Sequence, residues 1–194
     1  MKNKILFLLI VLISFFSCKK KAADSEKIII GASPVPHAEM LKLLVEDAKK
    51  DGFTLEIKEF SDYVTPNEAL ESGEIDANFF QHIPYMEAFN KDRGFHLVNA
   101  QAVHIEPMAV FSSKYKDIDE MKRKNGAQIA VPNDPTNEAR ALMLLENAGL
   151  IKLRNGVDIL ATVSDITENY ANIKIVEIEA ASLPRTLSDV DAAV

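Results

Sequence analysis

The sequence predicts an α/β protein in which helices pack on mainly parallel sheets. The apolar run 27–32 precedes a helical pattern over 37–50, and an alternating run over 53–58 follows it. A strand, a helix and a strand in that order form a βαβ unit, whose two strands pair in parallel. Strand and helix patterns continue to alternate along the chain, which favours this fold class for the whole of it.

The first unit rests on simple periodicities. Residues 27–32 form a short apolar run, typical of a buried strand. Across 37–50, apolar side chains recur at every fourth position and form one helical stripe, which Gly52 ends. Apolar and polar residues alternate over 53–58, so this predicted strand buries one face and exposes the other.

Similar signals assign the rest of the chain. Further helices are predicted over 65–73, 84–93, 117–124, 134–148 and 183–188, and further strands over 75–80, 96–110, 127–131 and 173–178, with 189–194 beginning another strand. The helix over 134–148 is the clearest, because Asp134 suits the N-cap, Pro135 suits the first helical position and Gly149 is a C-terminal stop.

The N-terminus predicts export and a lipid anchor. Lys2 and Lys4 precede the apolar run 5–13, which is too short to cross about 30 Å of hydrocarbon as a helix. It is typical of a secretory signal, so we assign 1–17 to a signal peptide and 18–26 to a tether. Cys18 follows Ser17 and resembles the acylated cysteine of a bacterial lipobox. The alternative is a buried free cysteine behind an uncleaved anchor.

Composition and charge exclude several functions. The net charge is −7, and −9 once Lys2 and Lys4 are removed, so binding to nucleic-acid phosphates is not expected. The chain has no Gly-x-Ser-x-Gly elbow, no phosphate-binding loop and no dinucleotide fingerprint. Its four histidines lack a metal-ligand spacing, so a metal site would need ligands distant in sequence. We therefore predict no enzyme, no cofactor and no metal.

Two side chains at the start of the helix over 134–148 are candidates for binding an anion. Asn137 and Arg140 lie three residues apart and so share one helix face. A helix N-terminus offers free N–H groups, and a guanidinium matches a carboxylate with two parallel donors. The alternative is a capped helix with a solvated arginine.

Aromatic residues gather at the predicted carboxyl ends of two strands, where ligands of α/β sheets bind. Phe79 and Phe80 end one strand and are followed by His82, and Tyr63 lies in the loop after another. Consecutive strand residues point to opposite faces, so at most one phenylalanine is expected in the core and the other beside a cleft. The alternatives are two core phenylalanines, a capping histidine and a loop tyrosine packed on its own helix.

These motifs together resemble the methionine-binding lipoprotein family, the substrate-binding component of a methionine importer driven by ATP hydrolysis. The resemblance runs from the signal peptide to Val194 and is most specific over 63–70, 76–85, 131–142 and 183–189. It implies a bilobed fold of periplasmic-binding-protein type, with a first α/β lobe over 27–113, a second over 114–194 and the ligand cleft between them.

The resemblance also implies residue roles. The positions matched by Tyr63, Phe79 and Phe80 enclose the methionine side chain, and the position of His82 adds a polar contact. Those of Asn137 and Arg140 hold the charged end of the amino acid. The partners implied are L-methionine or a close analogue, a membrane reached through lipid on Cys18, and the importer permease, on the periplasmic or extracellular side.

Three expectations remain open at this point. The ligand is methionine, or else a methionine-containing dipeptide or another apolar amino acid. A surface lipoprotein or adhesin with a vestigial pocket is the alternative from another class. Members of the family continue past Val194, with a further strand and an asparagine expected to contact the ligand's amino group, so we expect the second lobe to be incomplete in this chain.

Overall fold

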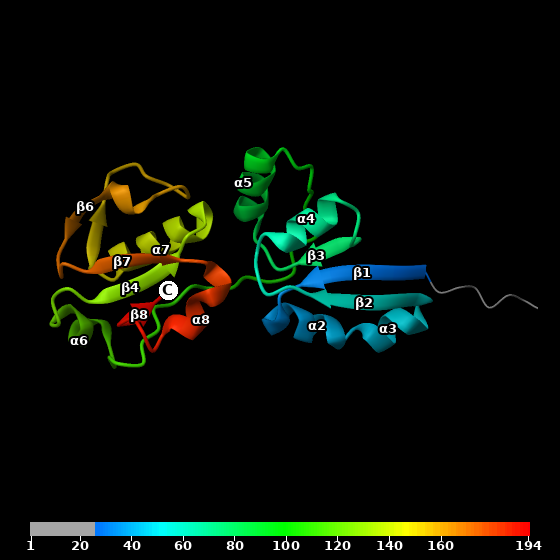
Figure 1. Ribbon diagram of the computed structural model, residues 1–194, viewed down its shortest axis with the longest axis horizontal. Coiled ribbons are helices and arrows are strands. Elements are labelled where there is room, and N and C mark those ends of the chain that lie inside the picture. The colour runs from blue at the N-terminus through cyan, green and yellow to red at the C-terminus, as the bar shows by residue number, and fades with distance from the viewer. Residues whose placement is uncertain (1–25) are drawn as a thin grey trace, which may run out of the picture.

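A computed structural model describes residues 26–194, and in it the chain forms two lobes joined by a connecting segment of residues 98–110 (Figure 1). The predicted signal peptide and Cys18 lie outside the described residues. The first lobe contains β1 (Glu26–Ala32), η1 (Pro34–Ala38), α2 (Glu39–Lys42), α3 (Val45–Lys50), β2 (Phe53–Glu59), α4 (Thr65–Glu71), β3 (Ala77–Phe79) and α5 (Ile83–Arg93). The second contains α6 (Ile118–Lys122), β4 (Gln128–Pro132), α7 (Pro135–Asn147), β5 (Ile151–Leu153), η2 (Val163–Asp165), β6 (Ile166–Asn169), β7 (Lys174–Ile178), η3 (Ala180–Ser182), α8 (Leu183–Thr186) and β8 (Ala192–Ala193).

Each lobe is built on a parallel sheet, as the sequence predicts. The strand order is β2-β1-β3 in the first lobe and β7-β4-β8 in the second, and every neighbouring pair in both sheets is parallel. An antiparallel pair of β5 and β6 adds a separate hairpin to the second lobe. The α/β class and the bilobed arrangement are therefore confirmed.

The first lobe packs closely against the backbone of β1 at Gly31. A Cβ atom at this position would lie 2.6 Å from Ile75 Cδ1 and 2.8 Å from Phe60 Cε2. Those distances are far below van der Waals contact, so a side chain here would force Phe60 and Ile75 to shift.

The helix predicted over 37–50 is interrupted. Leu43 N and Leu44 N bond to the carbonyls of Met40 and Leu41, three residues back, at 3.2 and 2.9 Å. These tighter turns separate α2 from α3. Leu44, a member of the apolar stripe, is 53% exposed, so the stripe is only partly buried and does not hold one continuous helix.

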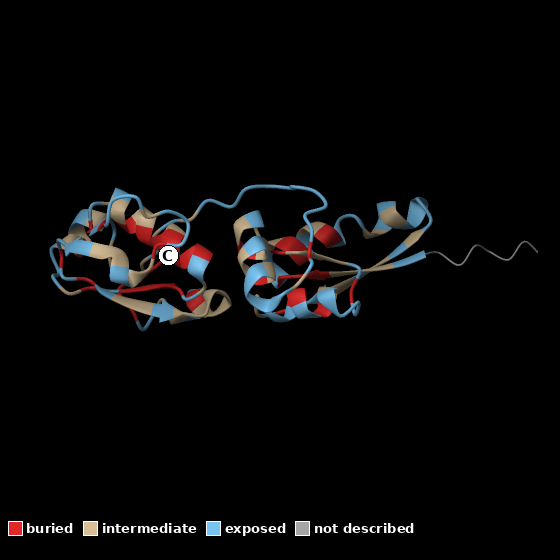
Figure 2. Cartoon of the chain, turned by 90° about the horizontal axis from the view of Figure 1, so that it is seen from above, coloured by how far each residue is buried: buried red, intermediate tan, exposed pale blue. Residues whose placement is uncertain are grey.

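The second lobe has the larger core. β4 is its central strand, and Ile129, Ala130 and Val131 are fully buried. Leu142 and Leu145 of α7 are also fully buried and pack in the same cluster as Ile129. Buried residues accordingly form separate groups in the two lobes, and the segment between the lobes is exposed (Figure 2).

The predicted strand over 96–110 is wrong, and two strands were missed. None of the described strands pairs with 96–110, and Val98, Val103 and Ile105 are 81, 60 and 91% exposed. Apolar alternation supplies strand propensity, but a strand also needs a neighbour for its backbone hydrogen bonds. β5 and β6 escaped prediction because three or four residues give almost no periodicity.

Candidate functional site

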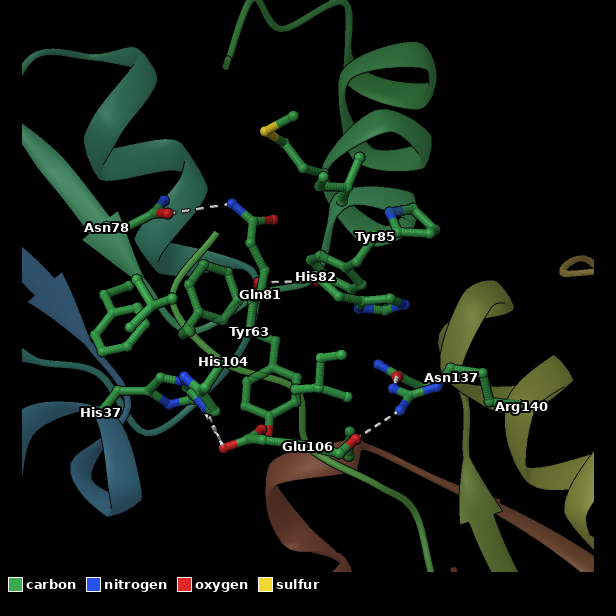
Figure 3. A pocket seen from close by; sticks show the side chains of 18 of the residues that line it. His37, Tyr63, Asn78, Gln81, His82, Tyr85, His104, Glu106, Asn137 and Arg140 are labelled. Carbon is green, nitrogen blue, oxygen red and sulfur yellow. Dashed lines mark hydrogen bonds and ion pairs between the residues drawn. The ribbon is translucent and has the colours of Figure 1, made fainter. Parts of the chain in front are cut away.

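A cleft of about 1290 Å³ opens between the lobes, beside the connecting segment (Figure 3). Its lining includes all six side chains that the sequence singles out, namely Tyr63, Phe79, Phe80, His82, Asn137 and Arg140. The first four come from the first lobe and the last two from the second. The fold thus gathers at one place residues that lie up to 77 positions apart in the sequence.

An aromatic wall covers the first-lobe side of the cleft. The rings of Tyr63 and Phe80 lie 5.7 Å apart, and Phe80 meets Tyr85 edge-on at 6.1 Å. Tyr85 donates its hydroxyl hydrogen to the carbonyl oxygen of Tyr63 at 2.8 Å, which fixes the loop that carries Tyr63 to α5. Flat rings held in this way present an apolar surface with few free rotamers.

Phe79 and Phe80 point to different clusters, as expected for neighbours in a strand. Phe80 packs with Tyr85 and Phe89, whereas Phe79 packs beside Ala32 and Ala38. Phe79 also meets the ring of His37 edge-on at 4.6 Å. Both phenylalanines line the cleft and both are largely covered by protein, so the expected division into one core and one cleft residue is too simple.

A network of amide side chains that no sequence motif predicted supports the aromatic wall. Asn67 Oδ1 accepts hydrogen bonds from Asn78 Nδ2 at 2.8 Å and from Gln81 Nε2 at 2.7 Å, and Asn67 is fully buried. These bonds tie α4 and β3 to Gln81, the residue directly before His82. Buried amides need partners, so the network fixes the position of His82. All three amides lie in or beside the motifs already named, which is the signal that could have revealed them.

His82 has an unsatisfied polar atom in the cleft. It occupies the N-cap of α5, yet its side chain makes no capping hydrogen bond, and its buried Nε2 has no partner. Its ring is directed across the cleft towards Asn137 and Arg140 (Figure 3). Burial lowers the pKa of His82, and the nearby positive charge of Arg140 lowers it further, so the ring is neutral at pH 7.

Asn137 and Arg140 form one hydrogen-bonded unit at the start of α7. Asp134 caps this helix by accepting from Asn137 N at 3.0 Å and from Asn137 Nδ2 at 3.1 Å. Arg140 Nη1 donates to Asn137 Oδ1 at 3.0 Å, and Arg140 Nη2 donates to the carbonyl oxygen of Glu106 at 3.0 Å. The guanidinium is thereby aimed into the cleft with donors left over, as the recognition of an anion requires.

One further cluster in the cleft wall was not predicted. His37 from the first lobe meets His104 and Glu106 from the connecting segment, and one ligand atom of each lies within 4.8 Å of the others. The sequence predicts no metal site, because its four histidines lack a metal-ligand spacing. A metal site in this chain was expected to need ligands that are distant in sequence, and these three residues meet that condition.

Comparison with known proteins decides the family. Residues 28–194 match the family described as NlpA lipoprotein. The chain belongs to the NlpA lipoprotein family. Among its relatives, a D-methionine-binding lipoprotein MetQ of Salmonella typhi is 46% identical over 177 residues, which cover 91% of this chain and 65% of the relative. This NlpA lipoprotein chain therefore spans less than two thirds of that relative's length.

Solved structures share the fold. A nutrient binding protein of Burkholderia cenocepacia bound to methionine has a TM-score of 0.81 and 47% identity, over 86% of this chain and 70% of that one. Lipoprotein Tp32 of Treponema pallidum has a TM-score of 0.83 and 44% identity, over 88% of this chain and 70% of that one. Within residues 26–194 of the NlpA lipoprotein described here, no helix has the length and apolar character needed to cross a membrane.

Proposed function

We propose that this chain belongs to a lipid-anchored substrate-binding protein that captures methionine and delivers it to an importer driven by ATP hydrolysis. The observation that carries the proposal is the pairing of Arg140 and Asn137 on one side of the cleft with the aromatic wall and the partnerless Nε2 of His82 on the other. The relatives named for methionine binding, and the related structure bound to methionine, support the same ligand.

The chemistry of methionine fits the two sides of the cleft. Its carboxylate matches the free donors of Arg140 beside the N-terminus of α7, where the helix dipole also favours negative charge. Its thioether matches the rings of Tyr63 and Phe80, and each contact of sulfur with a ring adds about 0.3–1.5 kcal/mol beyond simple burial. The lone Nε2 of His82 supplies a polar contact between these two ends.

Calorimetric titration of the full chain tests the ligand. We expect saturable binding of methionine, with L- and D-methionine compared because the relative is named for the D form. Norleucine, which replaces sulfur by methylene, should bind about two- to tenfold more weakly for each lost sulfur–ring contact. Methionine methyl ester, which has no carboxylate charge, should bind far more weakly than either. Saturable binding of another amino acid, together with no heat from methionine, would refute the assignment.

The membrane tether is a separate part of the proposal. It rests on Cys18, which lies outside the described residues, and on membership of a lipoprotein family. Expression with radiolabelled palmitate in a bacterial host should label the wild-type chain, and the Cys18→Ala variant should be unlabelled and leave the membrane fraction. Equal labelling of both chains would rule out this anchor.

A further inference from the structure

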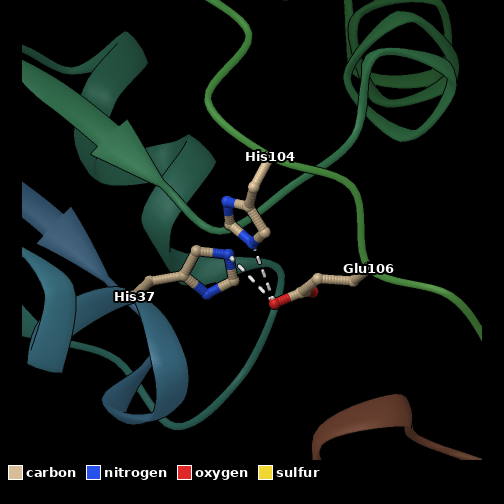
Figure 4. A group of neighbouring side chains, drawn as sticks. All are labelled: His37, His104 and Glu106. Atoms are coloured by element: carbon tan, nitrogen blue, oxygen red, sulfur yellow. Dashed lines mark hydrogen bonds and ion pairs between the residues drawn. The ribbon is translucent and has the colours of Figure 1, made fainter.

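Three potential metal ligands meet in the wall of the cleft (Figure 4). Glu106 Oε1 lies 3.7 Å from His37 Nε2 and 3.1 Å from His104 Nε2. His37 belongs to η1, next to the sheet of the first lobe, whereas His104 and Glu106 belong to the connecting segment. The cluster is thus formed only when the connecting segment lies against the first lobe.

His37 is held ready to act as a ligand through Nε2. Ser33 Oγ lies 2.6 Å from His37 Nδ1, and both residues are buried. When His37 Nδ1 donates its hydrogen to Ser33 Oγ, the lone pair is left on Nε2, which faces Glu106 and is the tautomer that a metal ion selects. Phe79 packs edge-on against the rings of both His37 and His104, at 4.6 and 5.6 Å, and limits their rotation. Metal-binding histidines are oriented by such contacts in the second coordination shell.

We propose that His37, His104 and Glu106 bind a divalent transition metal of the zinc class, with Ser33 as a positioning residue. Bonds of about 2.0 Å in a tetrahedral site place ligand atoms about 3.3 Å apart, and the two separations from Glu106, 3.1 and 3.7 Å, bracket that value. Two imidazole nitrogens favour zinc, nickel or copper over magnesium and calcium, which prefer oxygen.

The site would have an open coordination position. Three protein ligands are the pattern of zinc sites that keep the fourth position for water or another molecule. The cluster lies in the lining of the cleft, so this position is accessible from it. The carbonyl oxygen of Glu106 accepts from Arg140 Nη2, which connects the metal cluster to the guanidinium of the second lobe. A bound metal would therefore fix the connecting segment to the first lobe at the residue that the second lobe contacts.

Zinc titration of the full chain tests the proposal. The chain used carries Cys18→Ser, so that the cysteine thiol adds no metal ligand. Bound metal is first removed with a chelator. The protein then competes with a chromogenic indicator for Zn²⁺. We expect one equivalent of zinc to bind. A change in the second coordination shell typically weakens metal binding by about 10–100-fold, and Ser33→Ala should weaken zinc binding by about 10-fold. His104→Ala and Glu106→Gln remove a ligand, so each should weaken zinc binding by more than about 100-fold. Because His104 and Glu106 lie on the exposed segment, these two variants should fold like the parent.

His96 provides the matched control. His96 Nδ1 also lies near a carboxylate, at 2.9 Å from Glu71 Oε1, but within residues 26–194 this pair has no third metal ligand. His96→Ala should leave zinc affinity unchanged. Cobalt in place of zinc should give a visible absorption band in the parent that is lost in His104→Ala. The proposal is overturned if zinc does not bind saturably, if His96→Ala weakens binding as much as His104→Ala, or if folded His104→Ala and Glu106→Gln variants keep the affinity of the parent.

Discussion

Arg140 Nη2 donates a hydrogen bond to the carbonyl oxygen of Glu106 at 3.0 Å, and this bond joins α7 of the second lobe to the connecting segment. A second nitrogen of the same guanidinium donates to Asn137 Oδ1 at 3.0 Å. A guanidinium has five N–H donors, so it keeps donors for a carboxylate while these two bonds hold its plane. The side chain proposed to bind the ligand is therefore already oriented by protein groups.

Replacing Arg140 should remove methionine binding without unfolding the protein. Loss of one partner of a hydrogen-bonded charge pair costs about 2–5 kcal/mol, so Arg140→Ala should weaken binding at least about 30-fold. Arg140→Lys should recover only part of the affinity, because an ammonium group cannot form two parallel bonds with a carboxylate. Isothermal titration calorimetry measures both effects.

Arg154 is the control for this change. It lies on the β5–β6 hairpin of the same lobe, where it pairs with Asp165 away from the cleft lining. Arg154→Ala should keep the methionine affinity of the parent. If Arg140→Ala also keeps it, the carboxylate is bound elsewhere.

His82→Phe should separate ligand affinity from stability. Nε2 of His82 is buried without a partner, so replacing the imidazole with an apolar ring removes an unsatisfied polar atom and should not reduce the free energy of unfolding. A hydrogen bond to a charged ligand is worth about 1.5–3 kcal/mol, and its loss should weaken methionine binding about 10–100-fold. Urea denaturation and calorimetry measure the two quantities. A variant that is both less stable and unchanged in affinity would assign His82 a structural role.

Two leucines distinguish the core of the second lobe from an exposed position in the first. Leu142 is fully buried in the cluster around β4, whereas Leu43 is 80% exposed between α2 and α3. Leu142→Ala should lower the free energy of unfolding by about 2–5 kcal/mol, because it leaves a cavity. Leu43→Ala should change it by less than about 0.5 kcal/mol. Urea denaturation followed by circular dichroism gives both values, and similar losses would contradict the packing described here.

Asp191 should contribute a stability that depends on pH. Burial alone would raise the pKa of its carboxyl group, but hydrogen bonds from Lys124 Nζ and Gln128 N outweigh burial and hold the pKa below its ordinary value of 3.8. The unfolded chain then binds this proton first as pH falls. The contribution is fully present above about pH 4 and is lost as pH falls towards the pKa of the folded state.

The Asp191→Asn variant tests this sign. It should have a lower urea midpoint than the parent at pH 7, and the difference should shrink as the pH is lowered below about 4. Glu56→Gln is a suitable comparison, because Glu56 pairs with Lys27 on the surface, where ion pairs contribute about 0–1 kcal/mol. A constant difference between parent and Asp191→Asn from pH 7 to pH 3 would contradict the pKa direction.

The elements predicted correctly are those whose signals are local. For α7, the capping Asp134, the following proline and the terminal Gly149 all lie within the helix or beside it. Such signals depend only on neighbours in the chain, so they hold in any tertiary context. Strand formation over 96–110 instead depends on a neighbouring strand, which local sequence does not specify.

The contacts of the candidate site are also predictable from the sequence only where the residues are close together in the chain. Asn137 and Arg140 are three residues apart on one helix, so their direct hydrogen bond follows from helix geometry. His37 and Glu106 are separated by 69 positions and meet only because the connecting segment returns to the first lobe. A contact between residues this far apart cannot be predicted from the spacing of residues within one segment.

The strand orders of the two sheets set different conditions for folding during synthesis. All three strands of the β2-β1-β3 sheet are available once the chain has emerged as far as Phe79. β4, in contrast, lies between β7 and β8 and has neither neighbour when it emerges. Its backbone N–H and C=O groups must wait for their partners until residues 174–193 have been added. The first lobe is thus able to form its sheet while the nascent chain grows, and the second needs protection from premature strand pairing for much longer.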